Sequence, residues 1–185
     1  MEYAKFQYDK WQEIWRDARP EAYRDEDIRR QLTFLKELGT SALTEAELTD
    51  LTRTVGHMST IYGGATVCPF ENQNCNKTSD KVYTLDPEIV GKFAHSRNAD
   101  ELKYLWKQWR DESGKKIRSS YQKYVDLLNT AARANNYPDA SKWWQSRFED
   151  RNFVENIDRL WDQVSPLYNE LHTYMRYKLI EIYGE

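Results

Sequence analysis

The stretch from Thr44 to Gly64, TEAELTDLTRTVGHMSTIYGG, carries the clearest fold signal in the chain. Thr44 and Glu47 form the Ser/Thr-x-x-Glu pattern of a capping box, in which the two residues satisfy each other's backbone N–H groups at a helix start. Apolar residues then recur in steps of three and four, which places them on one helical face. They are Leu48, Leu51, Val55, Met58 and Tyr62. Gly63-Gly64 marks the end of this predicted helix.

Helix signals of the same kind continue on both sides of this stretch. We expect helices over 6–16, 25–38, 100–113, 117–134 and 153–183, and a short one after Asp139 that carries Trp143 and Trp144. Asp86-Pro87 predicts another helix start, with Asp86 as the N-cap and Pro87 in the first turn. Pro166 interrupts the last helix, but apolar residues keep their period across it, which favours one kinked helix. Because no segment alternates as a strand does, the chain is predicted to be all-α.

Composition narrows the classes of function. The formal net charge of −3 gives no cationic surplus for binding nucleic acid. No apolar stretch approaches the roughly 20 residues that span a bilayer, and Met1 is not followed by the apolar region of a signal peptide. Aromatic residues make up 14% of the chain, whereas the mean hydropathy of −0.92 is low for a self-contained globule. We therefore expect part of the aromatic surface to pack against sequence outside this chain.

The two cysteines flank a polar, turn-rich loop, Cys68-PFENQN-Cys75. A disulfide, a metal site and two unrelated thiols are the three interpretations. The disulfide is favoured, since no histidine or further cysteine lies nearby and zinc requires four ligands. Closing this loop would stabilise the fold by about 2.5 kcal/mol. Asn76-Lys77-Thr78 comes directly after the loop and is a glycosylation sequon, which fits the oxidising secretory compartment in which disulfides persist.

No catalytic constellation is complete in the sequence. His57, His95 and His172 lack the His-Glu-x-x-His spacing that puts two imidazoles on one helical face, and surface positions on helices explain all three. Trp106-Lys-Gln-Trp109-Arg110 has two interpretations. Arg110 could stack on a ring and bind an anion, or the tryptophans could be a core pair with Arg110 at its edge.

Several motifs, taken in order, resemble the angiotensin-converting-enzyme family of zinc peptidyl-dipeptidases. The resemblance runs from about residue 20 to the C-terminus and rests on Met58-Ser-Thr-Ile-Tyr62, Ala65-Thr-Val-Cys68, Leu85-Asp86-Pro87, Trp109-Arg110-Asp111-x-x-Gly114-Lys115, Ala131-Ala132-Arg133-x-Asn135 and Pro166-Leu167-Tyr168-x-x-Leu171-His172. It implies an elongated all-α peptidase that uses zinc and chloride to release C-terminal dipeptides from oligopeptides. The zinc motif lies beyond this sequence, so residues 1–185 are expected to be a partial domain, with lid and cleft-wall helices, that is inactive alone.

The resemblance also assigns roles to individual residues. Cys68 and Cys75 match the family's first disulfide, and Arg110 matches an arginine of the first chloride site. Asp86 lies where the family has an acidic residue near the pocket for the substrate's C-terminal side chain. Phe148 lies where many members have a tyrosine at the second chloride site, and it lacks the hydroxyl that would bind the anion.

Two functions are the resulting hypotheses. The first is a segment of an extracellular peptidyl-dipeptidase, either secreted or membrane-anchored, that needs the remainder of its domain. The second is a non-enzymatic helical module that binds peptides or a protein through its aromatic surface. Since the disulfide loop implies export while Met1 lacks a leader, we expect that Met1 is not the true start of the parent protein.

Overall fold

A computed structural model of the protein describes residues 6, 9–10, 13–14 and 19–184. The chain divides into two compact units, and each is described by itself. Unit 1 comprises residues 1–58 and 119–149, and unit 2 comprises residues 59–118 and 150–185. The helix expected over 6–16 includes Trp11 and Trp15, which lie outside the described residues, so that prediction remains untested there.

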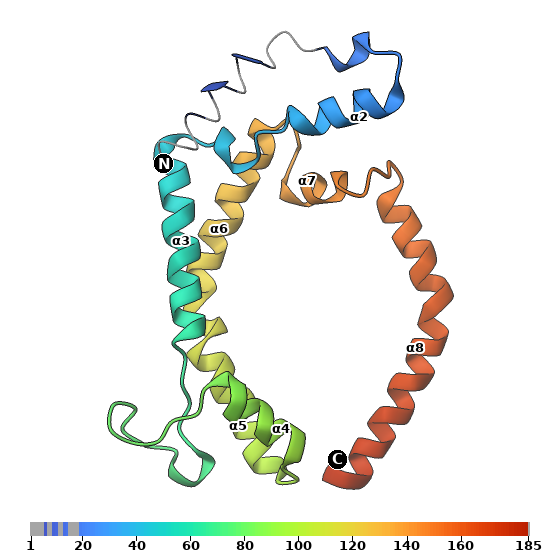
Figure 1. The fold of residues 1–185 in the computed structure, drawn as a ribbon. Coiled ribbons are helices and arrows are strands. Elements are labelled where there is room, and N and C mark those ends of the chain that lie inside the picture. Colours follow the sequence, from blue (N-terminus) through green and yellow to red (C-terminus); the bar gives the residue numbers. More distant parts are fainter. Residues whose placement is uncertain (1–5, 7–8, 11–12, 15–18, 185) are drawn as a thin grey trace. The chain divides into compact units, whose positions relative to one another are not determined.

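Helices form almost all the regular structure of the described residues (Figure 1). The α-helices are α2 (Glu26–Leu35), α3 (Glu45–Gly63), α4 (Val90–His95), α5 (Ala99–Glu112), α6 (Gly114–Ala134), α7 (Ala140–Ser146) and α8 (Phe153–Tyr183). Short turns of helix are η1 (Pro20–Ala22), η2 (Gly39–Ala42), η3 (Phe70–Asn72) and η4 (Leu85–Ile89). The described residues contain one isolated antiparallel bridge, Val67 to Tyr83, and no strand. The predicted all-α fold is confirmed.

Side chains cap several helix starts, and the capping box predicted at Thr44 is confirmed. Asp25 accepts hydrogen bonds from the N–H groups of Asp27 and Ile28 at the start of α2. Thr44 and Glu47 form the reciprocal capping box ahead of α3, at 3.3 and 2.9 Å. Several predicted boundaries were wrong. α6 starts at Gly114 rather than residue 117. α2 ends at Leu35 rather than residue 38, and α5 starts at Ala99 rather than residue 100 because Asn98 caps it.

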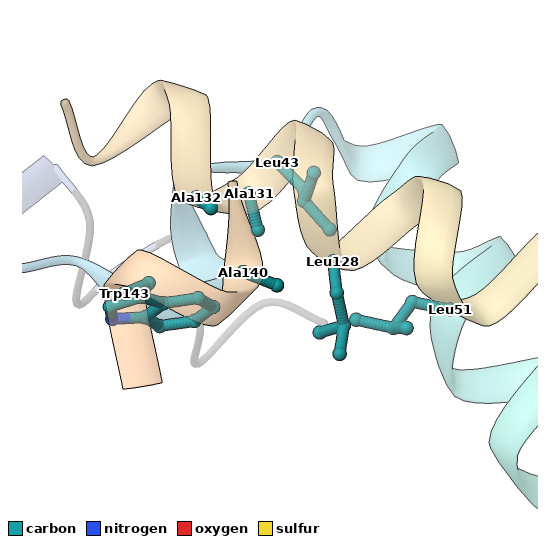
Figure 2. Close-up of a cluster of buried hydrophobic side chains, with 7 residues drawn as sticks. All are labelled: Leu43, Leu51, Leu128, Ala131, Ala132, Ala140 and Trp143. Atoms are coloured by element: carbon teal, nitrogen blue, oxygen red, sulfur yellow. The ribbon is translucent and has the colours of Figure 1, made fainter. Parts of the chain in front are cut away.

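Unit 1 has its core where α6 and α7 meet the start of α3. Figure 2 shows the buried side chains that converge there. They are Leu43, Leu51, Leu128, Ala131, Ala132, Ala140 and Trp143. Ala131 and Ala132 are fully buried, and their small side chains allow the backbones of neighbouring segments to come close.

Two polar side chains fix the segment between α2 and α3 in unit 1. Asn135 accepts from the N–H groups of Leu38 and Gly39 at 2.8 and 3.1 Å and donates to the Gly39 carbonyl at 2.8 Å. The Glu37 carboxylate accepts from Trp143 Nε1 and from the Tyr137 hydroxyl. These bonds satisfy polar groups that would otherwise lose their partners next to the core.

Unit 2 is built around a second cluster of buried apolar side chains. Its members come from the segment after α3, from η4 and from α5, and they are Ala65, Val67, Tyr83, Ile89, Leu105 and Trp109. Leu105 is completely buried. The bridge between Val67 and Tyr83 holds both ends of the intervening loop, with backbone hydrogen bonds of 2.9 and 2.8 Å.

α8 is one continuous helix of 31 residues that contains Pro166. The prediction of a helix continuing through the proline is confirmed. Helix α8 has no buried residue. Large apolar side chains recur along it in steps of one, three and four and remain exposed: Ile157, Leu160, Trp161, Val164, Leu167, Tyr168, Leu171, Met175, Leu179 and Ile182. We call these ten residues the α8 apolar face.

Candidate functional site

The disulfide loop lies between α3 and η4 in unit 2. Cys68 and Cys75 are bonded, with their Cα atoms 5.6 Å apart. This confirms the favoured interpretation of the two cysteines. Cys68 is buried, whereas the residues of the loop from Glu71 to Asn74 are exposed.

Helix α5 contacts the disulfide loop through Tyr104. The Tyr104 hydroxyl donates to the Cys68 carbonyl at 3.2 Å, and the Phe70 ring packs edge-on against Tyr104 with centroids 5.7 Å apart. Burial, with a smaller effect of the Glu112 charge, raises the pKa of Tyr104, so its hydroxyl stays protonated as a donor. Lys77 donates to the Thr66 carbonyl and pairs with Glu112, both at 2.9 Å.

Asp86 does not cap a helix, which corrects the prediction from its sequence. Its backbone is extended (φ −125°, ψ 128°), and its peptide bond to Pro87 is cis. The turn is instead closed by Thr84 and Glu88. The Thr84 N–H and hydroxyl both donate to the Glu88 carboxylate, at 3.1 and 2.7 Å, and these hydrogen bonds lower the pKa of Glu88.

The Asp86 side chain is exposed. No described residue makes a hydrogen bond or ion pair with its carboxylate, whereas the backbone carbonyl of Asp86 accepts from the Thr84 hydroxyl at 2.8 Å. The turn therefore fixes the backbone at Asp86 and leaves the charge available to a cationic group.

An ion pair between half-buried Lys92 and buried Glu101 joins α4 to α5. Glu101 is 6% exposed and accepts from Lys92 Nζ at 2.5 Å and from the Ser96 hydroxyl at 2.6 Å. Lys92 also lies 5.9 Å from the centre of the Tyr83 ring. The hydrogen bond from Lys92, followed by that from Ser96, lowers the pKa of Glu101, and the same bond raises the pKa of Lys92.

Arg110 stacks on a tryptophan at the surface of α5. Its guanidinium carbon lies 3.2 Å from the centre of the Trp106 ring, and Nη1 donates to the Trp106 carbonyl at 3.0 Å. Trp106 is 55% exposed, whereas Trp109 is 9% exposed and meets Tyr62 edge-on at 5.6 Å. The two tryptophans are therefore not a core pair. The arrangement has the geometry of the stacked alternative, with guanidinium N–H groups left over for an anion.

The other predicted site residues are Asn76 and Phe148. Asn76 is exposed in the turn after the disulfide. Phe148 belongs to unit 1, follows α7 and is 66% exposed. Within the described part of the chain, no hydrogen bond or ion pair joins Arg110, Asp86 and Asn76 to one another.

The histidines are surface residues of helices, as expected. His57, His95 and His172 are all exposed, and His172 stacks on Tyr168 at 5.9 Å. Over the described residues, no group of three or more His, Cys, Asp or Glu side chains could hold a metal ion. The described residues thus do not fit a zinc site.

Among the same residues, no helix has the length and apolarity of a membrane span.

Sequence reasoning missed the residues that position this region. Tyr104, Lys92 and Glu101 brace it, and each is a single polar residue within an amphipathic pattern. A Thr84-x-x-x-Glu88 spacing was visible beside Asp86-Pro87. It differs by one residue from the capping box that the sequence predicted correctly at Thr44.

These features define an all-helical, disulfide-braced chain whose described residues present charged groups without assembling a catalytic centre. The sequence profile of the peptidase family M2, angiotensin-converting enzyme, matches residues 1–185. The chain therefore belongs to the angiotensin-converting-enzyme family, which is a family of zinc metallopeptidases.

Curated relatives show the same affiliation. An angiotensin-converting enzyme-related protein of Drosophila melanogaster is 36% identical over 86% of this chain and 25% of its own length. An angiotensin-converting enzyme of Haematobia irritans exigua is 34% identical over 88% of this chain and 26% of its own length. The angiotensin-converting enzyme of Bos taurus is 34% identical over 88% of this chain and 12% of its own length. The chain thus spans about a quarter or less of the length of these relatives.

Proposed function

We propose that this chain supplies N-terminal helices of a peptidyl-dipeptidase that releases C-terminal dipeptides from oligopeptides and depends on zinc and chloride. The observation that carries the proposal is the family match over all of residues 1–185. Because the described residues hold no metal-ligand cluster, the zinc ligands would come from elsewhere in the parent protein. The chain is then a partial peptidase domain and has no catalytic activity by itself.

Arg110 is the residue that we propose for chloride. Its exposed guanidinium lies over the Trp106 ring and is fixed by one hydrogen bond, so it loses little side-chain freedom when it binds an anion. Phe148 has no hydroxyl to donate, so a second anion site at that position would lack this hydrogen bond.

Asp86 is the residue that we propose for substrate selection. The hydrogen bonds from Thr84 to Glu88 and to the Asp86 carbonyl fix the backbone at Asp86. Its carboxylate is exposed and has no partner among the described residues. An unpaired carboxylate favours a basic side chain on the peptide, since opposite charges attract at short range.

The remainder of the peptidase domain is the partner that we propose for the α8 apolar face. A helix with so wide an apolar face is normally covered by other helices.

The disulfide at Cys68 and Cys75 supports an extracellular location, either secreted or anchored in the parent protein, because such bonds persist in oxidising compartments.

The alternative is a non-enzymatic module, and the exposed α8 apolar face is the observation that favours it. Such a helix could bind an amphipathic peptide or protein segment directly, without further peptidase sequence. The two proposals predict different sequence downstream of Glu185 in the transcript. An in-frame His-Glu-x-x-His supports the peptidase, whereas a stop codon together with an upstream leader supports the module.

An activity assay tests the peptidase proposal. The 185-residue chain should not hydrolyse a blocked tripeptide, whereas the product of the longer reading frame should, and a zinc chelator should abolish that hydrolysis. In the longer product, R110Q should raise the chloride concentration for half-activation by about tenfold or more, because a charge-assisted hydrogen bond contributes about 1.5–3 kcal/mol.

Lys107 provides the control for Arg110. It is exposed on the same helix and pairs with Asp111 at 2.6 Å, so K107Q should leave the chloride dependence unchanged. Chelator-sensitive hydrolysis by the 185-residue chain alone would contradict both proposals.

A further inference from the structure

The turn after the disulfide is built around Asn76. The Asn76 side-chain oxygen accepts from the Thr78 N–H at 3.0 Å. Its backbone N–H donates to the Asp80 carboxylate at 2.9 Å, and its carbonyl accepts from the Asp80 N–H at 2.8 Å. These bonds form a compact turn over 76–80 that includes the whole Asn76-Lys77-Thr78 sequon.

The middle residue of the sequon attaches the turn to unit 2. Lys77 Nζ reaches the Thr66 carbonyl and the Glu112 carboxylate. Asn76 and Thr78 on either side are exposed. Neither Asn76 Nδ2 nor the Thr78 hydroxyl has a hydrogen-bond partner among the described residues, so both polar groups of the sequon face solvent.

The disulfide between Cys68 and Cys75 is a second observation, independent of the sequon, that indicates a secretory compartment. Cys75 directly precedes Asn76 and is paired with Cys68. A disulfide in a short exposed loop is typical of proteins that pass through an oxidising secretory compartment, and Asn-x-Ser/Thr sites on surface loops are modified in secreted proteins.

We propose that Asn76 carries an N-linked glycan. In this reaction Asn76 Nδ2 forms a bond to the anomeric carbon of a lipid-pyrophosphate-linked oligosaccharide. The bond from that carbon to the pyrophosphate oxygen breaks, and the amide nitrogen loses one proton. The inference goes beyond the proposed peptidase function, since it requires only export of the chain.

The glycan has a consequence for assembly. A bulky, hydrated group at Asn76 keeps the turn over 76–80 in solvent in the mature protein. The remainder of a parent protein therefore packs against surfaces of unit 2 other than this turn.

The test expresses the full chain behind a eukaryotic secretion leader. The secreted protein should lose mass when treated with an amidase that removes N-linked glycans, and the peptide containing residue 76 should then carry aspartate. N76Q and T78A should abolish the mass shift. T78S should retain it, because serine also supplies the hydroxyl that the sequon requires.

Asn74→Gln is the matched control, since Asn74 is an exposed loop residue that is not followed by Ser or Thr at the second position. Its mass shift should equal that of the unchanged chain. Because the glycan is added during import, translation in the presence of microsomes reports on variants that fail to fold. The proposal is overturned if the unchanged chain gains no glycan in microsomes, or if the shift persists in N76Q.

Discussion

Glu101 shows how single polar residues hold unit 2 together. It is buried, yet its carboxylate has two partners, Lys92 and Ser96. A buried charge is tolerated only when it is paired and hydrogen-bonded. Removing the negative charge would leave Lys92 without its main partner and would loosen α4 from α5.

We expect E101Q to lower the free energy of unfolding by about 1–3 kcal/mol at neutral pH, the usual effect of unpairing a buried hydrogen-bonding group. The pKa of Glu101 is lowered from 4.5 in the folded chain. Its stabilisation is therefore present above pH 4.5 and is lost as the pH falls through the lowered pKa. Urea unfolding between neutral and acidic pH should show a smaller loss of stability for E101Q than for the unchanged chain.

The control for this experiment is E170Q, at an exposed position of α8, which should stay within about 0.5 kcal/mol of the unchanged chain. Parallel pH dependence in E101Q and the unchanged chain would contradict the role given to Glu101.

Individual residues also show what the sequence could not reveal. Asn135 lies in one of the motifs that resemble the family, but its three bonds to Leu38 and Gly39 join positions almost a hundred residues apart. No local pattern predicts such a contact. Arg110 has two interpretations at the level of sequence because the sequence does not show which tryptophan is buried, and the exposure of Trp106 decides between them.

At the level of elements, local signals predicted helices well. Capping by Asp25, Thr44 and Asp139 depends on residues three or fewer positions away, and all three caps are present. The failure at Asp86 has a physical cause. The cap pattern considers only Asp86 and Pro87. The hydrogen bond from Thr84 to Glu88 instead closes a turn that begins two residues before Asp86.

The disulfide loop is an element whose contribution can be measured. We expect the double variant C68S/C75S to lose about 2.5 kcal/mol of unfolding free energy, because the open loop gains conformational freedom in the unfolded chain. Urea unfolding of both proteins measures the difference. Reductant should destabilise the unchanged chain by a similar amount and should leave the variant unaffected.

Tyr104 tests whether the loop also depends on its anchor. In Y104F the hydroxyl that donates to the Cys68 carbonyl is absent, which should cost about 1 kcal/mol while the disulfide still forms. If C68S/C75S were as stable as the unchanged chain, the disulfide itself would contribute nothing to stability.

For the molecule as a whole, the aromatic-rich composition predicted that some apolar surface would be left uncovered within this chain. The structure has many large apolar side chains that are exposed. The exposed large apolar residues gather on α8, which has no buried residue. Sequence periodicity identified these residues as one face. It could not say what covers them, because a core contact and an intermolecular contact produce the same pattern.

The α8 apolar face should therefore drive self-association of the isolated chain. Burying one leucine contributes about 1.5–3 kcal/mol. The double variant L167E/L171E should thus weaken association by about a hundredfold or more, as measured by sedimentation over a range of concentrations. N169E puts one such charge at an exposed position outside this face and should leave association unchanged. If extra peptidase sequence is the true partner, the longer product should stay monomeric and bind less of an apolar dye. A 185-residue chain that stays monomeric at high concentration and binds no such dye would show that α8 is covered from within the chain.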